Sequence, residues 1–318
     1  MKIMAEHIYA KDTIAAVATA WGEGGIGIIR LSGPKAISIV DKIFIAKNKK
    51  KLNIAPSFTL HYGFIQDKQK SAVKKNKYNK KTEIIDEVIV SLMRSPYTYT
   101  REDVLEINSH GGIVAVKKIL NLVLKQGARL ANPGEFTQRA FLNGRIDLIQ
   151  AEAVLNIVNA KTEAALAPAM AQLQGVLSAK INILKNSLIE IIAPLEAEID
   201  FPDESVDRVF RRRLAKKLKL TLSQIKIILN DADKGIMLQN GISMVLAGAA
   251  NVGKSSLMNA FVDYERVIVT HISGTTRDVV EELINIKGVP VKIADTAGIM
   301  NSSCVITKES VSRSLIFF

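Results

Sequence analysis

The stretch TIAAVATAWGEGGIGIIRLS, residues 13–32, decides how the first part of this 318-residue chain folds. Two short apolar runs flank a glycine-rich segment, which is the pattern of a β-hairpin. Further strand-like runs follow in FTLHYGFI (58–65), EVIVSLM (87–93) and DVLEINSH (103–110). A helical period then runs through IVAVKKILNLVLKQG and ends at Gly127, where glycine favours a left-handed cap. These patterns predict a compact α+β domain over residues 1–144.

The pattern changes after the Asn143-Gly144 turn. Asp147 is followed three residues later by Gln150, which resembles a capping box at the start of a helix. From there to about residue 239 the apolar residues recur every three or four positions, as on one face of a helix. We expect interruptions at Pro168, near Pro194 and at Phe201-Pro202. Residues 145–239 are therefore predicted to form a helical middle domain in several segments.

A phosphate-binding motif follows in ISMVLAGAANVGKSSLMNAF, residues 242–261. The pattern GxxxxGK[ST] runs from Gly248 to Ser255, between a strand-like run and a helix-like run. Small residues let consecutive backbone N–H groups surround phosphate oxygens, and the positive end of the next helix points at them. Lys254 would reach the β- and γ-phosphates, and the Ser255 hydroxyl would bind Mg²⁺. Residues 240–318 are therefore predicted to hold an α/β P-loop nucleotide-binding domain.

Two later segments complete the predicted nucleotide site. The threonine-rich loop VIVTHISGTTRD (267–278) offers a second hydroxyl to Mg²⁺, and VKIADTAG (291–298) places Asp295 at the end of a strand, suited to holding the metal through water. The Gly298 N–H would sense the γ-phosphate. The predicted GTP-binding residues are Asn251, Val252, Gly253, Lys254, Ser255, Ser256, Thr270, Thr275, Thr276, Asp295, Thr296, Ala297 and Gly298.

Composition indicates a cellular compartment and leaves the role of the lysine-rich segments open. A single cysteine, Cys304, fits a reducing compartment, and the absence of a signal-like or long apolar run predicts a cytoplasmic protein that does not span a membrane. The formal net charge is +12. Eleven lysines lie in the stretches 47–51 and 68–81, and the one acidic residue between Lys47 and Lys81 is Asp67. Solvated loops and a tRNA-facing patch both account for them.

Several longer blocks resemble the MnmE (TrmE) family of tRNA-modification GTPases, from residue 12 to about residue 314. They are DTIAAVATAWGEGGIGIIRLSGP, YTREDVLEINSHGG, NPGEFTQRAFLNGRIDLIQAEAV, EAEIDFPDE, NVGKSSLMNA, IVTHISGTTRD and DTAGI. The resemblance implies an N-terminal domain that forms a homodimer and binds 5-formyl-tetrahydrofolate, and a helical domain that carries an inserted Ras-like G domain. Residues 240–318 would then be an incomplete Ras-like α/β P-loop G domain. It also implies a GTP-, Mg²⁺- and K⁺-dependent enzyme that, with an MnmG-type flavoprotein, adds an aminomethyl-type group at C5 of the tRNA wobble uridine.

The resemblance assigns site residues by position. The potassium ligands would be Asn251, Thr270, Ile272 and Thr275, and the two Mg²⁺ hydroxyls would come from Ser255 and Thr276. A bound K⁺ would neutralise charge near the β- and γ-phosphates, where other GTPases use an arginine. The folate-contacting positions fall on Arg30, Glu106 and Arg145.

Departures from the family pattern lead to an alternative function. The position of the family's water-orienting glutamate falls on Thr307, and the sequence ends before the guanine-reading NKxD motif and the C-terminal CIGK tail. We expect a C-terminally truncated family member with impaired GTP hydrolysis and no certain catalytic residue. The alternative is a folate-binding dimerisation module joined to a non-functional G-domain remnant. Guanine selectivity, the tRNAs modified and the origin of the short C-terminus stay open.

Overall fold

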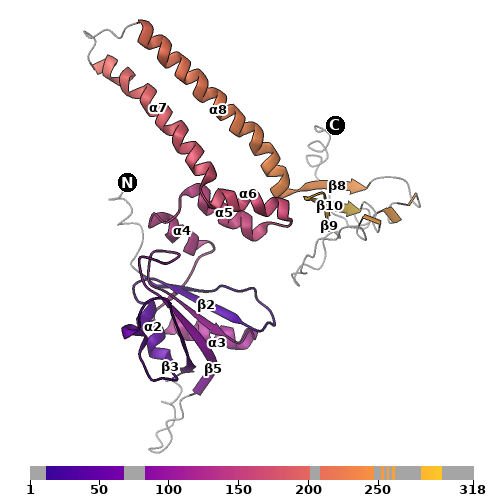
Figure 1. The fold of residues 1–318 in the computed structure, drawn as a ribbon. Coiled ribbons are helices and arrows are strands. Elements are labelled where there is room, and N and C mark those ends of the chain that lie inside the picture. The colour runs from indigo at the N-terminus through magenta and orange to yellow at the C-terminus, as the bar shows by residue number, and fades with distance from the viewer. Residues whose placement is uncertain are drawn as a thin grey trace, which may run out of the picture. The chain divides into compact units, whose positions relative to one another are not determined.

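A computed structural model describes residues 12–67, 83–200, 208–246, 252–253, 256–257, 260–261 and 281–295. Two compact units make up the chain, residues 1–151 and 152–318 (Figure 1). The boundaries 144/145 and 239/240 expected from the sequence stay a prediction.

The first unit is built on a seven-stranded sheet. Its strands are β1 (Ile14–Val17), β2 (Gly27–Ser32), β3 (Phe44–Ala46), β4 (Thr59–Asp67), β5 (Glu83–Met93), β6 (Val104–Ser109) and β7 (Arg129–Leu130). The spatial order is β3-β4-β5-β6-β2-β1-β7, and every neighbouring pair is antiparallel except β1 and β7. The predicted hairpin is confirmed, because β1 pairs with β2 from Ile14–Ser32 to Val17–Ile29.

Helices α2 (Ala36–Ile43) and α3 (Ile113–Lys125) pack on one face of this sheet (Figure 1). Successive strand residues point to opposite faces, so the apolar residues at every second position meet these helices. The α2 face contributes Ile39 and Val40, and the α3 face contributes Ile119 and Val123. The fully buried strand residues of this core include Ala15, Ile29, Leu31, Ile65, Val90, Leu92, Leu105 and Ile107.

Shorter elements join the strands and lead out of the unit. They are the 3₁₀ turn η1 (Leu52–Ile54), α4 (Glu135–Leu142) and α5 (Leu148–Asn159). The predicted capping box is present at the start of α5. The Gln150 N–H donates to Asp147 Oδ1 over 2.8 Å, and the Asp147 N–H donates to Gln150 Oε1 over 3.0 Å. Two backbone donors that a helix start leaves unpaired are thus satisfied reciprocally.

The second unit contains α6 (Glu163–Leu173), α7 (Val176–Asp200) and α8 (Arg208–Asn240). The expected interruptions at two prolines were wrong, because Pro168 lies inside α6 and Pro194 inside α7. Each proline removes one backbone hydrogen bond, and the strong helix formers around it carry the helix through. The break before α7 falls at Gly175, which has φ of 88°. Phe201-Pro202 lies outside the described residues.

A three-stranded sheet follows α8, with the order β8-β10-β9. Its strands are β8 (Ile242–Leu246), β9 (Glu281–Ile286) and β10 (Val289–Asp295). β8 and β10 are parallel, with Asp295 opposite Leu246, and β9 and β10 form an antiparallel hairpin. At the hairpin turn the Thr162 hydroxyl donates to the Gly288 carbonyl over 2.8 Å and accepts from the Ala165 N–H, so one side chain caps α6 and holds the turn.

The close approach of β3 and β4 gives a testable prediction of stability. A Cβ at Gly63 would overlap the backbone carbonyl of Ile45 on the neighbouring strand. We expect Gly63→Ala to lower the free energy of unfolding of the first unit by about 1–3 kcal/mol, because backbone must move to admit the methyl group. Urea unfolding followed by the fluorescence of Trp21, the only tryptophan, measures it.

Gly25→Ala is the matched control for Gly63→Ala. Nothing lies within 4 Å of a Cβ built at Gly25. This control is expected to change the free energy of unfolding by less than about 0.5 kcal/mol. Equal stability of the two variants would contradict the packing argument.

Candidate functional site

Strand alternation and register bring an arginine and a carboxylate together on the face of the first sheet opposite α2 and α3. Ile29 and Leu31 are fully buried in the core, so Arg30 between them points to the other face. The same alternation applies to Glu106, which lies between the buried Leu105 and Ile107. β2 and β6 pair with Arg30 directly opposite Glu106. Two of the three predicted folate-contacting residues are therefore cross-strand neighbours.

The pair is held by charge-assisted hydrogen bonds. Arg30 Nε and Nη2 each lie 2.7 Å from Glu106 Oε1. The guanidinium also lies over the Phe136 ring, 5.8 Å from its centroid, within the range of a cation–π contact. The side chains of Arg30 and Glu106 keep 34% and 21% of their surface exposed, so an incoming ligand can reach both charges.

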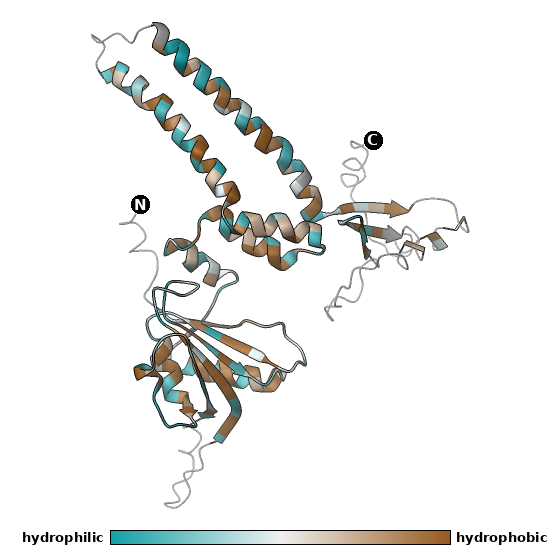
Figure 2. Cartoon of the chain, viewed as in Figure 1, coloured by the Kyte–Doolittle hydropathy of each residue, from teal (hydrophilic) through white to brown (hydrophobic). Residues whose placement is uncertain are grey.

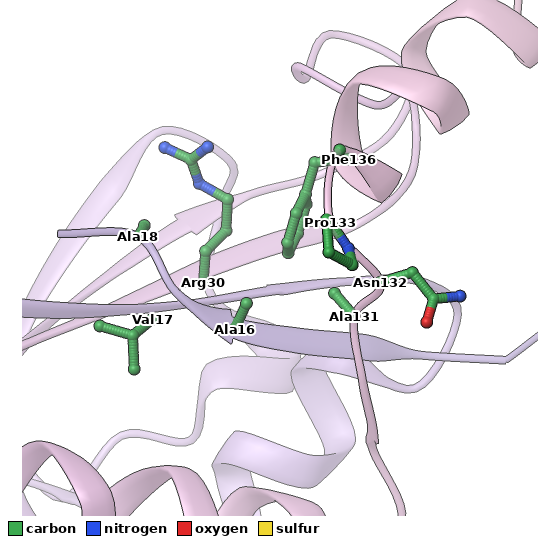
Figure 3. Close-up of a pocket in the computed structure, with 9 residues that line it drawn as sticks. Ala16, Val17, Ala18, Arg30, Ala131, Asn132, Pro133 and Phe136 are labelled. Atoms are coloured by element: carbon green, nitrogen blue, oxygen red, sulfur yellow. The ribbon is translucent and has the colours of Figure 1, made fainter. Parts of the chain in front are cut away.

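A cavity of about 360 Å³ opens beside Arg30. In Figure 3 the side chains of Arg30 and Phe136 lie side by side above the strand that carries Ala16. The cavity is lined by Ala16, Val17, Ala18, Arg30, Ala131, Asn132, Pro133, Gly134 and Phe136. Small side chains on β1 form the floor, and the segment after β7 forms a wall with the aromatic ring. One cation beside a mostly apolar surface is the usual composition of a small-molecule site.

The wall of this cavity rests on a cluster of charged residues that sequence analysis missed. Arg139 on α4 is nearly buried and donates to Asp12 Oδ1 over 2.6 Å, to Glu135 Oε1 over 3.0 Å and to both oxygens of Glu102 over 3.2 Å. Arg129 on β7 donates to Asp12 and Glu135 over 2.7 Å each. Three segments that are distant in sequence, around Asp12, Glu102 and residues 129–139, meet at these ion pairs.

Glu135 connects the charged cluster to the cavity. Its Oε2 accepts the Asn132 N–H over 2.8 Å, so the turn that carries Pro133 and Gly134 is closed by a buried carboxylate. Burial raises the pKa of the Glu135 carboxyl, but hydrogen bonds from Arg129, the Asn132 backbone and Arg139 outweigh burial and bring its pKa to about 2. Glu135 is therefore ionised at neutral pH and holds the cavity wall as a carboxylate.

Of the three predicted folate residues only Arg30 lines the cavity; Glu106 pairs with Arg30 without lining it, and the lining does not include Arg145 either. Arg145 follows the Asn143-Gly144 turn, and its guanidinium stacks 4.6 Å above the centroid of the Tyr99 ring. The Tyr99 hydroxyl in turn bonds to the Thr137 hydroxyl of α4 over 2.9 Å. Arg145 thus contacts the helix that carries Phe136 through Tyr99.

The described part of the nucleotide segment has the expected topology. β8 leads into the phosphate loop, and β10, parallel to it, ends at Asp295. Gly253 has φ of 91°, a left-handed conformation that glycine adopts without strain, and its carbonyl accepts the Leu257 N–H over 2.9 Å. Val252 is exposed, and Ser256 and Leu257 are helical. Ligands of open α/β sheets bind outside the carboxyl ends of parallel strands, which is where both segments lead.

The other predicted nucleotide and metal residues lie outside the described residues. They are Asn251, Lys254, Ser255, Thr270, Ile272, Thr275, Thr276, Thr296, Ala297, Gly298 and Thr307, together with the side chain of Asp295. The lysine-rich stretch 68–81 also lies outside them.

The described residues form neither a metal-binding cluster nor a membrane-spanning helix. In this part of the chain there is no group of three or more His, Cys, Asp or Glu residues able to hold a metal ion. None of its helices is both long enough and apolar enough to cross a membrane. His110 instead pairs with Asp86, with Nδ1 2.6 Å from Oδ1, and this hydrogen bond raises the pKa of the exposed imidazole.

Comparison with known proteins defines the class of the chain. Two family models match it. One is described as the GTP-binding protein TrmE N-terminus and covers residues 13–145, and the other is described as the MnmE helical domain and covers residues 148–312. The fold and these matches define a multidomain protein in which an N-terminal TrmE domain precedes an MnmE helical domain and a P-loop segment.

Individual relatives agree with the family models. The chain is 52% identical over 303 residues to a tRNA modification GTPase MnmE of Carboxydothermus hydrogenoformans, covering 95% of this chain and 63% of the relative. Proteins of the same name from Alkaliphilus metalliredigens and Listeria innocua are 48% and 47% identical, with 98% and 95% of this chain and 65% and 63% of the relatives covered. The chain belongs to the MnmE family, and it spans a little under two thirds of the length of these relatives.

The low pKa of Glu135 predicts a specific loss of stability in acid. The pKa is about 2 in the folded state against an ordinary value of 4.5, so the folded state binds this proton less readily than the unfolded chain. The stabilisation is therefore complete above about pH 5 and is lost as the pH falls from there towards 2. We expect Glu135→Gln to be less stable than wild type by about 3 kcal/mol at pH 7, because it weakens a buried ion pair.

Urea unfolding followed by Trp21 fluorescence between pH 7 and pH 3 tests the role of Glu135. The difference between wild type and Glu135→Gln should shrink as the pH falls. Glu163→Gln, which removes an acidic residue from the first turn of α6 in the second unit, is the control and should leave this transition unchanged. A difference between wild type and Glu135→Gln that stays constant with pH would contradict the assignment.

Proposed function

We propose that this chain acts as a tRNA-modification GTPase of the MnmE type. The observation that carries the proposal is the parallel pairing of β8 with β10. Because the two strands are parallel neighbours, their carboxyl ends, Leu246 and Asp295, lie side by side. The phosphate-loop sequence follows Leu246, and nucleotides bind outside the carboxyl ends of such strands. The similarity to tRNA modification GTPases supports this reaction class. We propose in addition that, with an MnmG-type flavoprotein, the protein adds an aminomethyl-type group at C5 of the tRNA wobble uridine. It does so as a cytoplasmic homodimer joined through the N-terminal domains.

The proposed nucleotide site uses this chain's residues as follows. Lys254 and the backbone of Asn251 to Ser256 hold the phosphates, and the hydroxyls of Ser255 and Thr276 bind Mg²⁺. Asn251, Thr270, Ile272 and Thr275 hold K⁺, which supplies positive charge where the β–γ bond breaks. Thr307 stands where the family has a glutamate, and a threonine hydroxyl does not orient water as a carboxylate does. We therefore propose slow hydrolysis.

A second function, binding of 5-formyl-tetrahydrofolate, is favoured by the cavity beside Arg30. The residues present fit this ligand: Phe136 offers an aromatic face to a pterin ring, and Arg30 offers a guanidinium to carboxylate or carbonyl oxygens. Glu106 offers a carboxylate to an amino-pterin edge. Arg145 would contribute from the Tyr99 side. This function stands without the nucleotide site, so the protein can be a folate-binding dimerisation module even if GTP is not turned over.

The folate proposal is tested by calorimetric titration with 5-formyl-tetrahydrofolate. We expect wild type to bind saturably and Arg30→Ala to bind at least about tenfold more weakly, because the ligand loses a charge-assisted contact and Glu106 loses its partner. Arg213→Ala removes an exposed arginine of the second unit and should bind as wild type does. Equal weak heats from all three proteins would reject a site in this cavity.

The nucleotide proposal is tested by phosphate release in K⁺ and in Na⁺, together with competition of a fluorescent guanine nucleotide by GTP and by ATP. We expect Mg²⁺-dependent binding that Lys254→Ala abolishes, and turnover that K⁺ raises little, because Thr307 lacks a carboxylate. Rapid potassium-dependent hydrolysis would overturn the role given to Thr307. Absence of saturable nucleotide binding would leave the folate module as the function of the chain.

A further inference from the structure

The N-terminal half of α8 has an unusual charge composition. Residues 208–226, RVFRRRLAKKLKLTLSQIK, contain eight Lys or Arg residues and no Asp or Glu. Helices of soluble proteins usually mix both signs on their exposed surface, since opposite charges one turn apart stabilise each other. Eight like charges on about five turns repel one another, so this composition carries an energetic cost that needs an explanation.

One face of α8 is explained by packing against α7. The less exposed positions between residues 210 and 230 recur every three or four residues. They are Phe210, Leu214, Lys217, Thr221, Ile225 and Ile228. Ile225 and Ile228 line an apolar groove with Leu184 and Leu188 of α7. Hydrophilic and hydrophobic residues alternate along α8 in Figure 2, as this one-sided packing requires.

The opposite face of α8 carries a stripe of positive charge. Arg212, Lys216, Lys219 and Lys226 recur at intervals of four, three and seven residues, which places all four within about 80° around the helix axis. All four are exposed, and between Arg212 and Lys226 the stripe runs about 21 Å along the helix. We call these four residues the basic stripe.

Two other basic residues of the helix have a structural role that the basic stripe lacks. Arg211 pairs with Glu198 of α7, and Lys217 pairs with Glu190 of α7, so these two hold the helical hairpin together. No ion pair within the described part of the chain involves a member of the basic stripe. The stripe is thus a row of positive charges on the side of the helix that faces away from α7.

We propose that the basic stripe binds the sugar-phosphate backbone of an RNA, which under the proposed function is the tRNA substrate. A row of lysine and arginine side chains spaced by about one helical turn matches a polyanion with regularly spaced phosphates. The stripe carries no aromatic side chain for base stacking, so it positions the RNA without reading its sequence. The proposed function is used only to identify the RNA as tRNA; the binding of an RNA backbone is inferred from the basic stripe itself.

An anionic membrane surface fits the basic stripe less well. A helix that lies on a membrane inserts its apolar face between the lipids and keeps its basic residues beside the headgroups. In α8 Leu214, Ile225 and Ile228 face α7, so these apolar side chains are not free to enter a bilayer while the hairpin is intact. The exposed apolar residues Leu218, Leu222 and Leu229 lie about 100° around the helix axis from the middle of the basic stripe, to its side and not on the face that carries it.

The test compares two double variants of the full 318-residue chain that carry the same change of net charge. Arg212→Gln with Lys216→Gln removes two members of the basic stripe, and Arg211→Gln with Lys217→Gln removes the two residues paired with α7. Binding of a fluorescein-labelled tRNA transcript is followed by anisotropy over a series of salt concentrations. For the stripe variant we expect a severalfold rise in Kd and a salt slope smaller by about 2, since each lost phosphate contact lowers the slope by about 1. The matched variant should keep the wild-type slope.

Each outcome decides the inference. Weaker tRNA binding by the stripe variant alone, with a circular dichroism spectrum like that of wild type, supports RNA binding by the stripe. Equal weakening of both variants would show an effect of net charge and overturn it, as would a wild-type chain that does not bind the transcript. Tighter binding of wild type to phosphatidylserine-containing vesicles than to tRNA would assign the stripe to membranes instead. The stripe variant should bind nucleotide and folate as wild type does. A loss of RNA binding by the stripe is therefore distinguishable from a failure of the proposed function.

Discussion

The first unit depends on the nearly buried guanidinium of Arg139. It joins Asp12 before β1, Glu102 before β6 and Glu135 at the start of α4, so three segments far apart in sequence share one positive charge. A buried ion pair adds little net stability, because desolvation offsets the attraction, but loss of one partner leaves a charge stranded in a site of low dielectric constant. The cluster therefore acts mainly by fixing one arrangement of these segments.

That arrangement decides where a ligand can bind. The Glu135 carboxylate accepts hydrogen bonds from Arg139 and Arg129 and also from the Asn132 N–H, so the cavity wall is built on the charged cluster. Phe136 follows Glu135 directly and lies over the Arg30 guanidinium. The chemistry of the cavity comes from residues on its surface, while its shape comes from carboxylates and guanidinium groups beneath it.

The second unit is organised by amphipathic helices. The apolar side of α8 packs on α7 and its charged side faces away, so one periodic sequence specifies both an intramolecular contact and a surface. The hairpin of β9 and β10 is fixed to α6 by the hydroxyl of Thr162, which bonds to the Gly288 carbonyl. Thr162 thus joins the strand that ends at Asp295 to the helical part of the unit.

The sequence by itself determined local structure and family. Period-two alternation around Arg30 and Glu106, the Asp147–Gln150 capping box and the GxxxxGK[ST] pattern are short-range signals, because each depends on residues a few positions apart. Only the tertiary structure decided which distant residues meet. The Arg30–Glu106 register and the Arg139 cluster join positions 37 to 127 residues apart, and neither leaves a periodic signal in the sequence. The two prolines show that a local signal can also mislead. Pro168 and Pro194 predicted helix breaks, but both lie inside helices, because the helix propensity of the surrounding residues offsets the loss of one backbone hydrogen bond at each proline.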